Sequence, residues 1–454
     1  MVEIRPLEHL DATIRIPGSK SYTQRAMVIA ALAEGESLLK DVLISEDTGV
    51  LAEALCVLGA DIRRKERDMI VAGTGGKIAR PSRPIHLGNN GTAMRFLAGV
   101  ASLGRGPFVL TGDPRLRERP MQPLLSALAT LGIDIRTAGD RGYPPVTLRG
   151  GTLRGGEVVL RDIESSQYVS SLLIVSPFAE RDMTIVLEGE IPSLPYVALT
   201  TETMGAFGVA VAADGAGRYV VKSGQRYRGR EYRIEGDVSS ASYFFLAAAL
   251  LKGRIRLENI NPRTGQGDIA LLAILERLGC TVIRGENHVV IEGGDLPGEE
   301  MTFDLGAMPD MVPTLAVLSA LRPGRTIIRN VAHLRLKESD RLAALVNELR
   351  KTGISAEEIT DGIAITGGSP HGAAIATYND HRIAMSFAVL GLAVPGMRID
   401  GEECVGKSFP GFWEALEGLY RNGPIPPENG ARQTMMPPPA GDRVEAFGER
   451  VERI

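Results

Sequence analysis

Lys20, Ser21 and Arg25 follow Pro17 and Gly18 in the stretch IPGSKSYTQRAM, where an apolar strand is expected to give way to a helix. The backbone N–H groups and the dipole at a helix N-terminus favour an anion, and the two cations would strengthen that preference. A turn of this kind more often only caps its helix. The stretch alone therefore leaves two interpretations open, a helix cap and an anion site.

Five further turns have the same design, with polar or Gly/Pro residues followed by an apolar segment rich in small residues. The six turns begin PGSKS, GNNGT, ESSQY, GDVSS, AMPDM and YNDHR. A helix that is apolar on every side is expected to be buried. If the six turns are equivalent, the helix N-termini that they precede can converge on one cleft, where anions would be held.

Loops between these turns add cations, namely three arginines in TGDPRLRERP, Lys337 and Arg341 in LRLKESDR, and Lys407 in VGKSF. Arginine binds carboxylates and phosphates through two parallel hydrogen bonds, whereas lysine supplies a point charge. Because the whole chain has a formal net charge of -4, this local density predicts a small substrate that carries several phosphate or carboxylate groups. The same net charge argues against nucleic acid or an anionic membrane as a partner.

The remaining composition is typical of a cytoplasmic protein. The three cysteines lie far apart without a CxxC pair, which predicts neither a disulfide framework nor a zinc site. The first residues have no apolar run after a basic region, and the longest apolar run of the chain is broken by Pro395. We therefore expect a cytoplasmic location and no membrane-spanning segment.

A fixed period underlies these motifs. Helix ends marked by a glycine recur at spacings of about 71 to 76 residues, at Gly59, Gly132, Gly208, Gly279 and Gly353. Each glycine stands where a helix needs a left-handed C-terminal residue, and a strand-forming run follows it. We expect six such α/β units, three in each of two domains. The alternative is one open, doubly wound α/β sheet, but its GxGxxG fingerprint does not follow the first expected strand.

Six segments in order resemble the motifs of the 5-enolpyruvylshikimate-3-phosphate (EPSP) synthase family: PGSKSYTQRAM, LGNNGTAMRFL, TGDPRLRERP, GDVSSASYF, LRLKESDRL and TYNDHRIAMSF. The resemblance implies the two-domain enolpyruvyl transferase fold, an inside-out α/β barrel. Domain I would comprise residues 1–15 and 236–422, domain II residues 16–235, and a Pro-rich tail residues 423–454. It implies transfer of the enolpyruvyl group of phosphoenolpyruvate to shikimate 3-phosphate without a metal or organic cofactor, in a monomer.

The resemblance also assigns site residues. Those implied for phosphoenolpyruvate are Lys20, Asn89, Gly91, Thr92, Arg119, Gln167, Arg341, His381, Arg382 and Lys407. Those implied for shikimate 3-phosphate are Lys20, Ser21, Arg25, Ser165, Ser166, Gln167, Ser193, Tyr196, Asp310, His333 and Lys337. His333 stands where the family often has Asn. The catalytic residues would be Asp310, as acceptor of the hydroxyl proton, Glu338, as carrier of the proton at C3, and Lys20.

Two other functions compete with this interpretation. An enolpyruvyl transferase that acts on UDP-N-acetylglucosamine shares the repeat, but it is expected to carry a cysteine in the loop that reads TGDPRLRERP here. A non-catalytic anion-binding protein of the same fold would have no need for the carboxylates of Asp310 and Glu338 among so many cations. We therefore expect the shikimate 3-phosphate reaction.

The last segment, DRVEAFGERVERI, places Val444, Phe447, Val451 and Ile454 near one helical face. A helix docked on the body or on a neighbour is therefore one interpretation of the end of the chain. A solvated tail is the other, and the Pro-rich stretch before it favours this second interpretation.

Overall fold

The computed structural model describes residues 1–137, 142–215, 217–421 and 452–453. Val444, Phe447, Val451 and Ile454, on which the prediction for the tail depended, lie outside the described residues. Within the tail the structure describes only β24 (Glu452–Arg453), an antiparallel strand paired with Arg63 and Arg64 rather than a helix.

One supersecondary unit recurs along the chain, in the order strand, helix, strand, helix and two strands. Its first two strands pair in parallel, and the last two add to them in antiparallel fashion. The unit is complete in β6 (Ile85–His86), α3 (Gly91–Ala101), β7 (Gly106–Thr111), α4 (Gln122–Thr130), β8 (Asp134–Thr137) and β9 (Val146–Gly150).

Two more units are continuous in the sequence. One consists of β10 (Gly156–Arg161), α5 (Gln167–Val175), β11 (Met183–Glu188), α6 (Pro195–Ala206), β12 (Val211–Ala213) and β13 (Arg218–Val221). The other consists of β18 (Met301–Asp304), α9 (Val312–Leu321), β19 (Arg325–Arg329), α10 (Arg341–Lys351), β20 (Ser355–Ile359) and β21 (Gly362–Thr366).

The other three units borrow a strand from a distant part of the chain. β14 (Glu231–Arg233) completes α1 (Lys20–Leu32), β3 (Glu36–Lys40), α2 (Glu46–Val57), β4 (Asp61–Lys65) and β5 (Asp68–Ala72). β2 (Asp11–Arg15) completes α7 (Val238–Leu251), β15 (Arg254–Glu258), α8 (Leu271–Arg277), β16 (Thr281–Arg284) and β17 (His288–Glu292). β1 (Val2–Glu3) joins β22 (Ala374–Ala376), α11 (His381–Ala393), β23 (Arg398–Asp400) and α12 (Phe412–Arg421).

The predicted fold class, α/β with six repeated units, is confirmed, because the described residues form six separate sheets and not a single doubly wound sheet. All five periodic glycines have positive φ, between 85° and 108°, as expected for the left-handed residue after a helix. The six turns do precede buried helices, since α1, α3, α5, α7, α9 and α11 are buried over most of their length.

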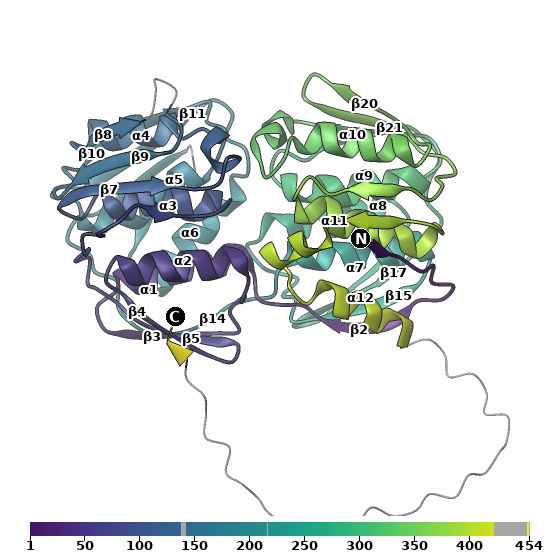
Figure 1. Cartoon of the computed structure of the whole chain (residues 1–454), viewed down its shortest axis with the longest axis horizontal. Helices are drawn as coiled ribbons and strands as arrows, with labels where there is room; N and C mark the ends of the chain where they lie inside the picture. The colour runs from purple at the N-terminus through teal and green to yellow at the C-terminus, as the bar shows by residue number, and fades with distance from the viewer. Residues whose placement is uncertain (138–141, 216, 422–451, 454) are drawn as a thin grey trace, which may run out of the picture.

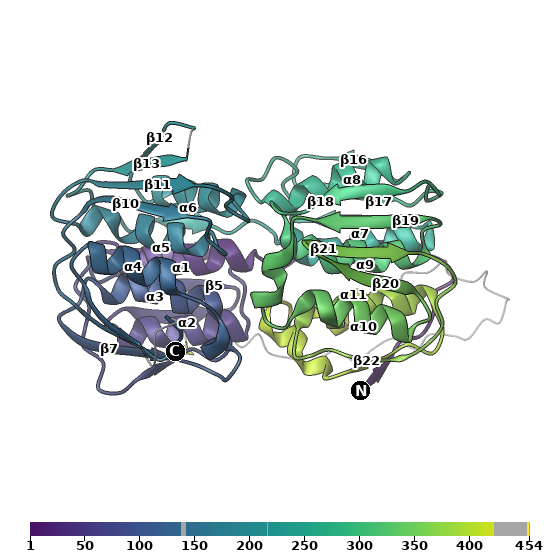
Figure 2. The same ribbon diagram turned by 90° about the horizontal axis from the view of Figure 1, so that it is seen from above.

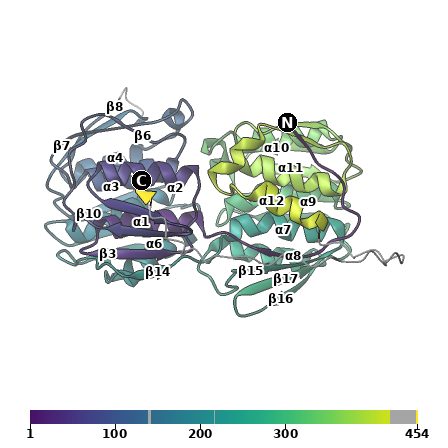
Figure 3. The same ribbon diagram turned by 60° about the horizontal axis from the view of Figure 1, so that its bottom comes forward.

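The molecule has two lobes, which lie side by side in Figures 1 and 2. The core of the first lobe contains residues between Tyr22 and Ile234, and that of the second lobe contains residues 4–16 and 241–419. In each lobe the buried helices lie inside and the sheets outside, an inside-out arrangement in which the described strands form open sheets rather than a closed barrel (Figure 3). The predicted domain limits remain a prediction, which these cores support except that Ile16 packs with the second core.

Between residues 1 and 421 the chain crosses between the lobes twice, and these two crossings lie against each other. Gly18 and Gly236 form an isolated antiparallel bridge there, and β2, drawn in purple, lies in the second lobe (Figure 1). A Cβ atom at Gly236 would lie 1.8 Å from the carbonyl oxygen of Asn259. No helix among the described residues is long and apolar enough to span a bilayer.

We predict that Gly236→Ala lowers the free energy of unfolding by about 1 to 3 kcal/mol, because the new methyl group has backbone on one side and no room to move. Gly205→Ala is the matched control, since Gly205 is exposed on α6 with nothing within 4 Å of its Cβ position. The control should be neutral or slightly stabilising. Urea unfolding of both variants checks this, and equal stability of the two would contradict the crossing's tight packing.

Candidate active site

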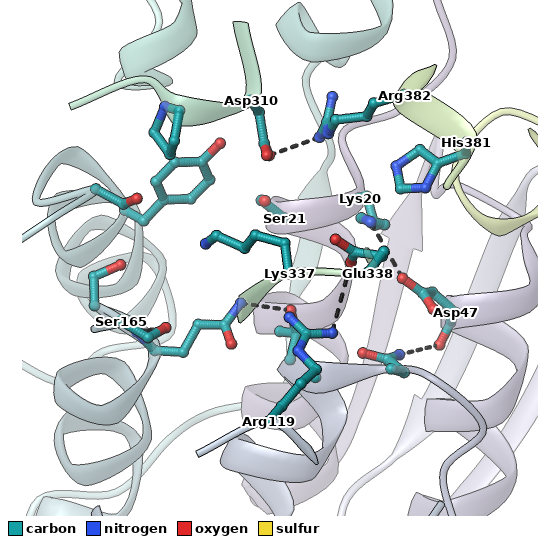
Figure 4. Close-up of a pocket in the computed structure, with 18 of the residues that line it drawn as sticks. Lys20, Ser21, Asp47, Arg119, Ser165, Asp310, Lys337, Glu338, His381 and Arg382 are labelled. Carbon is teal, nitrogen blue, oxygen red and sulfur yellow. Dashed lines mark hydrogen bonds and ion pairs between the residues drawn. The ribbon is translucent and has the colours of Figure 1, made fainter. Parts of the chain in front are cut away.

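A polar pocket lies between the two lobes and takes its lining from both. From the first lobe come Lys20, Ser21, Arg25, Asp47, Asn90, Gly91, Thr92, Arg119, Ser165, Ser166, Gln167, Ser193 and Tyr196, and from the second Pro309, Asp310, Lys337, Glu338, His381 and Arg382. Figure 4 shows Lys20, Glu338 and Arg119 turned toward one another, with the Asp310–Arg382 pair above them. Five lysines and arginines therefore face three carboxylates, so the pocket favours anions.

Several of these side chains stand at helix N-termini, as the repeated turns predicted. Lys20 and Gly91 are the first residues of α1 and α3, whose caps Ser19 and Asn90 accept hydrogen bonds from the backbone N–H groups of Tyr22 and Ala93. His381 begins α11 behind its cap, Asp380. Local capping chemistry therefore sets where each helix starts, and the start fixes which side chain meets the cleft.

Asp47 joins the two lobes through Lys407 and also binds Lys20 of its own lobe. Its carboxylate accepts hydrogen bonds from Lys20 Nζ at 3.2 Å and from Lys407 Nζ at 2.6 Å. Lys407 also donates to the carbonyl oxygen of Asn89 at 3.2 Å. Burial acts to lower the pKa of Lys407, but the Asp47 and Glu338 charges outweigh it and raise that pKa, so the ammonium stays charged.

Gly91 leaves room for two guanidinium groups. A Cβ atom there would lie 2.3 Å from Arg95 Nη1 and 2.6 Å from Arg119 Cζ, so a larger residue would displace both side chains. Arg119 lies 3.7 Å from Glu338 and donates to the Asn89 carbonyl. Burial lowers the pKa of Arg119 to about 10, which still leaves it charged at neutral pH.

The neighbouring part of the pocket is lined with hydroxyl and amide groups. Gln167 donates to Thr92 Oγ1 at 2.9 Å and accepts a hydrogen bond from Arg95. Ser165, Ser166 and Ser193 lie nearby on the first lobe, and Ser193 donates its backbone N–H across the cleft to the Gly306 carbonyl. These groups offer donors to an anion without adding charge.

Arg25 and Tyr196 form the wall behind these hydroxyls. Arg25 is held by Thr200 Oγ1 and by the Ser21 and Tyr196 carbonyls, and burial lowers its pKa to about 10. Tyr196 donates to Asp268 at 3.2 Å, from the first lobe to the second. Burial, with the charge of Asp310, raises the pKa of Asp268 to about 7.

Arg341 lies beneath the pocket and binds three carboxylates. It contacts Asp380 at 2.9 Å, Glu338 at 2.8 Å and Asp310 at 3.1 Å, with only 1% of its side chain exposed. Arg382 holds Asp310 from the other side at 2.6 Å. Although burial opposes ionisation, Arg382 and Arg341 lower the pKa of Asp310 to about 2, and Arg119 and Arg341 hold that of Glu338 well below its usual range.

Two further basic groups of the pocket, Lys337 and His381, have lowered pKa values. Burial, together with Arg119 and Arg341, lowers the pKa of Lys337 to about 8. Burial, with Lys20 and Arg382, holds the pKa of His381 well below its ordinary value, so its imidazole is neutral at neutral pH. Both ring nitrogens of His381 lack a hydrogen-bond partner within the described residues, and they are available to a ligand.

The structure brings most of the predicted site residues to this pocket, with four exceptions. Asn89, Arg341 and Lys407 lie directly behind its lining, where they hold Arg119, the carboxylates and Asp47. His333 instead lines an adjacent cavity of about 1050 Å³, together with Glu164 and Leu194. Within the described residues no group of three His, Cys, Asp or Glu side chains is arranged to hold a metal ion.

The model of the EPSP synthase (3-phosphoshikimate 1-carboxyvinyltransferase) family matches residues 4–416. The 3-phosphoshikimate 1-carboxyvinyltransferase of Syntrophobacter fumaroxidans is 43% identical over 420 residues, which are 92% of this chain and 99% of the relative. The chain therefore belongs to the EPSP synthase family. The enzyme of that name from Methanoculleus marisnigri is also 43% identical, with the same coverage. A solved EPSP synthase from Acinetobacter baumannii has a TM-score of 0.76 and 30% identity, over 92% of this chain and 97% of that one.

These matches confirm the predicted family and the predicted class of enzyme, a transferase of the shikimate pathway. They also agree with the fold, since the EPSP synthase of Acinetobacter baumannii is similar over nearly its whole length.

Sequence reasoning missed Asp47 and Asn90 of this EPSP synthase family site. Asp47 follows Ser45 at the start of α2, where an acidic residue is already explained by the helix dipole and the capping box. Its partner Lys407 is 360 residues away, so no local pattern pointed to the pair. Asn90 could have been found, because it caps α3 within the polar turn GNNGT.

We predict that Asp47→Asn destabilises the free protein by about 3 to 5 kcal/mol, because Lys20 and Lys407 lose a buried counter-charge. Inorganic phosphate should restore part of this loss by supplying negative charge to the same lysines. Urea unfolding with and without phosphate measures both effects.

Asp182→Asn is the control, since Asp182 pairs with Lys222 on the exposed surface. It should change stability little and show no special response to phosphate. If phosphate stabilised the two variants and the unaltered protein equally, Asp47 would not be the counter-ion of an anion site.

Proposed function

We propose that the protein transfers the enolpyruvyl group of phosphoenolpyruvate to the 5-hydroxyl of shikimate 3-phosphate and releases phosphate. The observation that carries the proposal is one pocket in which cations from both lobes converge on two ionised carboxylates, Asp310 and Glu338. Each of the two substrates has one phosphate and one carboxylate, and binding groups for them are abundant in the pocket. The family match supports the same reaction.

The pocket can be divided between the two substrates by charge and position. Phosphoenolpyruvate is proposed to lie among the side chains of Lys20, Arg119, Arg382 and His381, near the backbone of Gly91. Shikimate 3-phosphate is proposed to bind the serine hydroxyls, Arg25, Tyr196, Asp310 and Lys337. Gln167 lies between the two groups, since it contacts Thr92 on one side and follows the serines on the other. His333 has no role in this division.

The reaction proceeds by addition and elimination. The 5-hydroxyl oxygen bonds to C2 of phosphoenolpyruvate while C3 takes a proton, and the adduct then loses that C3 proton as the bond from C2 to the phosphate oxygen breaks. Asp310 is ionised and can accept the hydroxyl proton. Lys20 and Arg119 face the negative charge of the departing phosphate.

Glu338 is the proposed carrier of the C3 proton, although its pKa is low in the free protein. The low pKa comes from nearby cations, above all Arg119, Arg341, Lys407 and Lys20. Bound phosphate and carboxylate groups neutralise part of this positive field, so the pKa of Glu338 rises when the substrates bind. The substrates thereby help to make Glu338 able to hold a proton.

We further propose that a monomer is the active form, as the resemblance to the EPSP synthase family implies. We also propose that the protein works in the cytoplasm, on the grounds of its cysteine usage and composition.

Phosphate release from phosphoenolpyruvate tests the function. We expect release with shikimate 3-phosphate and none with UDP-N-acetylglucosamine. Asp310→Asn should bind both substrates and lose most turnover, because the ionised base is gone. Release with the nucleotide sugar alone would indicate the sister reaction, and binding of both substrates without any release by the unaltered protein would indicate an anion-binding protein.

We predict a limb in the pH profile that belongs to Lys337. Its ammonium group is present below about pH 8 and is lost as the pH rises through that value. The ratio kcat/KM for shikimate 3-phosphate should therefore fall over that interval in the free enzyme. Lys337→Arg keeps its charge at every working pH and should lack this limb, even if its activity is lower. An unchanged limb in Lys337→Arg would assign it to another group.

A further inference from the structure

Arg115 reaches from the first lobe to the second and binds backbone there. It lies in the loop between β7 and α4, at the start of the short helix η1 (Leu116–Glu118). Its Nη2 donates to the Arg335 carbonyl at 2.8 Å, and its Nε donates to the Lys337 carbonyl at 3.0 Å. One guanidinium group thus holds two carbonyls at the end of the short helix η5 (Ala332–Leu336).

The carbonyl of Lys337 belongs to the peptide bond that joins Lys337 to Glu338. This bond is planar, so fixing the direction of its carbonyl also fixes the direction in which the Cα atom of Glu338 lies. Lys337 has extended backbone, φ -91° and ψ -154°, and it ends η5. Carbonyls at the end of a helix lack partners within the helix, and Arg115 supplies the missing donors.

The loop that carries Arg115 also contacts the side chain of Glu338. Arg119 lies four residues along the same loop, and its Nη1 is 3.7 Å from Glu338 Oε1. The loop therefore holds Glu338 twice, through its preceding carbonyl and through its carboxylate. Arg115 is itself oriented by Glu118, which accepts a hydrogen bond from Nη1 at 3.1 Å.

The neighbouring arginine side chains have partners of their own, and Arg115 binds the carbonyls of Arg335 and Lys337. The Arg335 side chain turns to its own lobe, where it pairs with Asp340 and Glu358. Arg117, in the same loop as Arg115, donates its Nε to the Gly112 carbonyl and so stays within the first lobe. Among the cations of this loop, Arg115 is the one that binds the backbone of the opposite lobe.

We propose that Arg115 is a positioning residue for the reaction: it couples contact between the lobes to the placement of Lys337 and Glu338. The inference rests on the proposed function, because it assigns Arg115 an effect on the residues that would bind the acceptor and carry the C3 proton. Arg115 acts through the Lys337–Glu338 peptide. When the lobes separate, both hydrogen bonds break and the peptide is free to turn, so the site is complete only when the lobes meet.

Kinetics of Arg115→Gln test the proposal, with Arg117→Gln as the matched control on the same loop. Loss of two charge-assisted hydrogen bonds should reduce kcat/KM for phosphate release by about 10- to 100-fold, whereas the control should stay close to the unaltered protein. Arg115→Lys should recover part of the loss, because an ammonium group can still donate to one carbonyl. Equal rates of Arg115→Gln and the control would overturn the proposal.

A double-mutant cycle separates positioning from a general structural effect. If Arg115 acts through Glu338, Arg115→Gln should reduce the residual activity of Glu338→Gln much less than it reduces that of the unaltered protein. Full additivity of the two losses, with unchanged thermal unfolding, would contradict the proposed route.

Hydrogen exchange provides a readout that does not depend on activity. Backbone amides of residues 336–340 should exchange faster in Arg115→Gln than in Arg117→Gln, with the rest of the chain unchanged. Equal exchange in the two variants would refute the contact even if neither released phosphate. If the two variants show the exchange difference but the unaltered protein releases no phosphate, the proposed function is wrong although the contact is present.

Discussion

The structure depends on keeping many cations buried between two lobes while leaving them able to bind an anion. Arg341 illustrates how the chain meets this constraint, since its guanidinium is almost fully buried and faces Asp380, Glu338 and Asp310. Charges that are buried without partners destabilise the fold, and Arg341, Arg382 and Lys407 each have a carboxylate beside them. Among the described residues Arg25, Arg119 and Lys337 have no carboxylate as close, and burial lowers the pKa of each, so the charge of a bound anion would stabilise all three.

The two crossings of the chain place this charge network. α1 and α7 begin directly after the crossings, and the carboxylate of Asp237, the cap of α7, also accepts the backbone N–H of Lys20 at 2.8 Å. A single carboxylate therefore organises the starts of two helices in different lobes. Any change in the angle between the lobes must disturb the position of Lys20, because its own backbone is part of the junction. Contact between the lobes and formation of the site are thus physically linked.

Much of this arrangement could be predicted because it depends on local sequence patterns. The glycines from Gly59 to Gly353 mark helix ends by a conformation that glycine adopts without strain, so their period revealed the six units. The polar turns likewise indicated helix N-termini, and a cleft shared by these termini follows from the repeat.

The features that could not be predicted depend on contacts between distant residues whose local sequence is ordinary. Asp47 resembles any acidic residue at a helix start until Lys407 is placed beside it, and Arg115 resembles a solvated loop arginine until two carbonyls of the other lobe are known. The sheet that β2 or β14 joins also depends on where the chain crosses between the lobes, and the short sequence of either strand does not indicate its partner.

The carboxylates that stabilise the free protein are also the groups proposed to do the chemistry. In the free state Asp310 and Glu338 offset the charge of Arg341, Arg382 and Arg119, and for this reason both are ionised. An incoming phosphate or carboxylate competes for the same cations. Each cation that turns to the ligand withdraws stabilisation from a carboxylate, and the affinity of that carboxylate for a proton increases. Glu338, whose ionisation depends on four separate cations, is the group most sensitive to this exchange. In the proposed reaction, recognition of an anionic substrate and activation of the proton carrier would therefore be two results of one redistribution of charge.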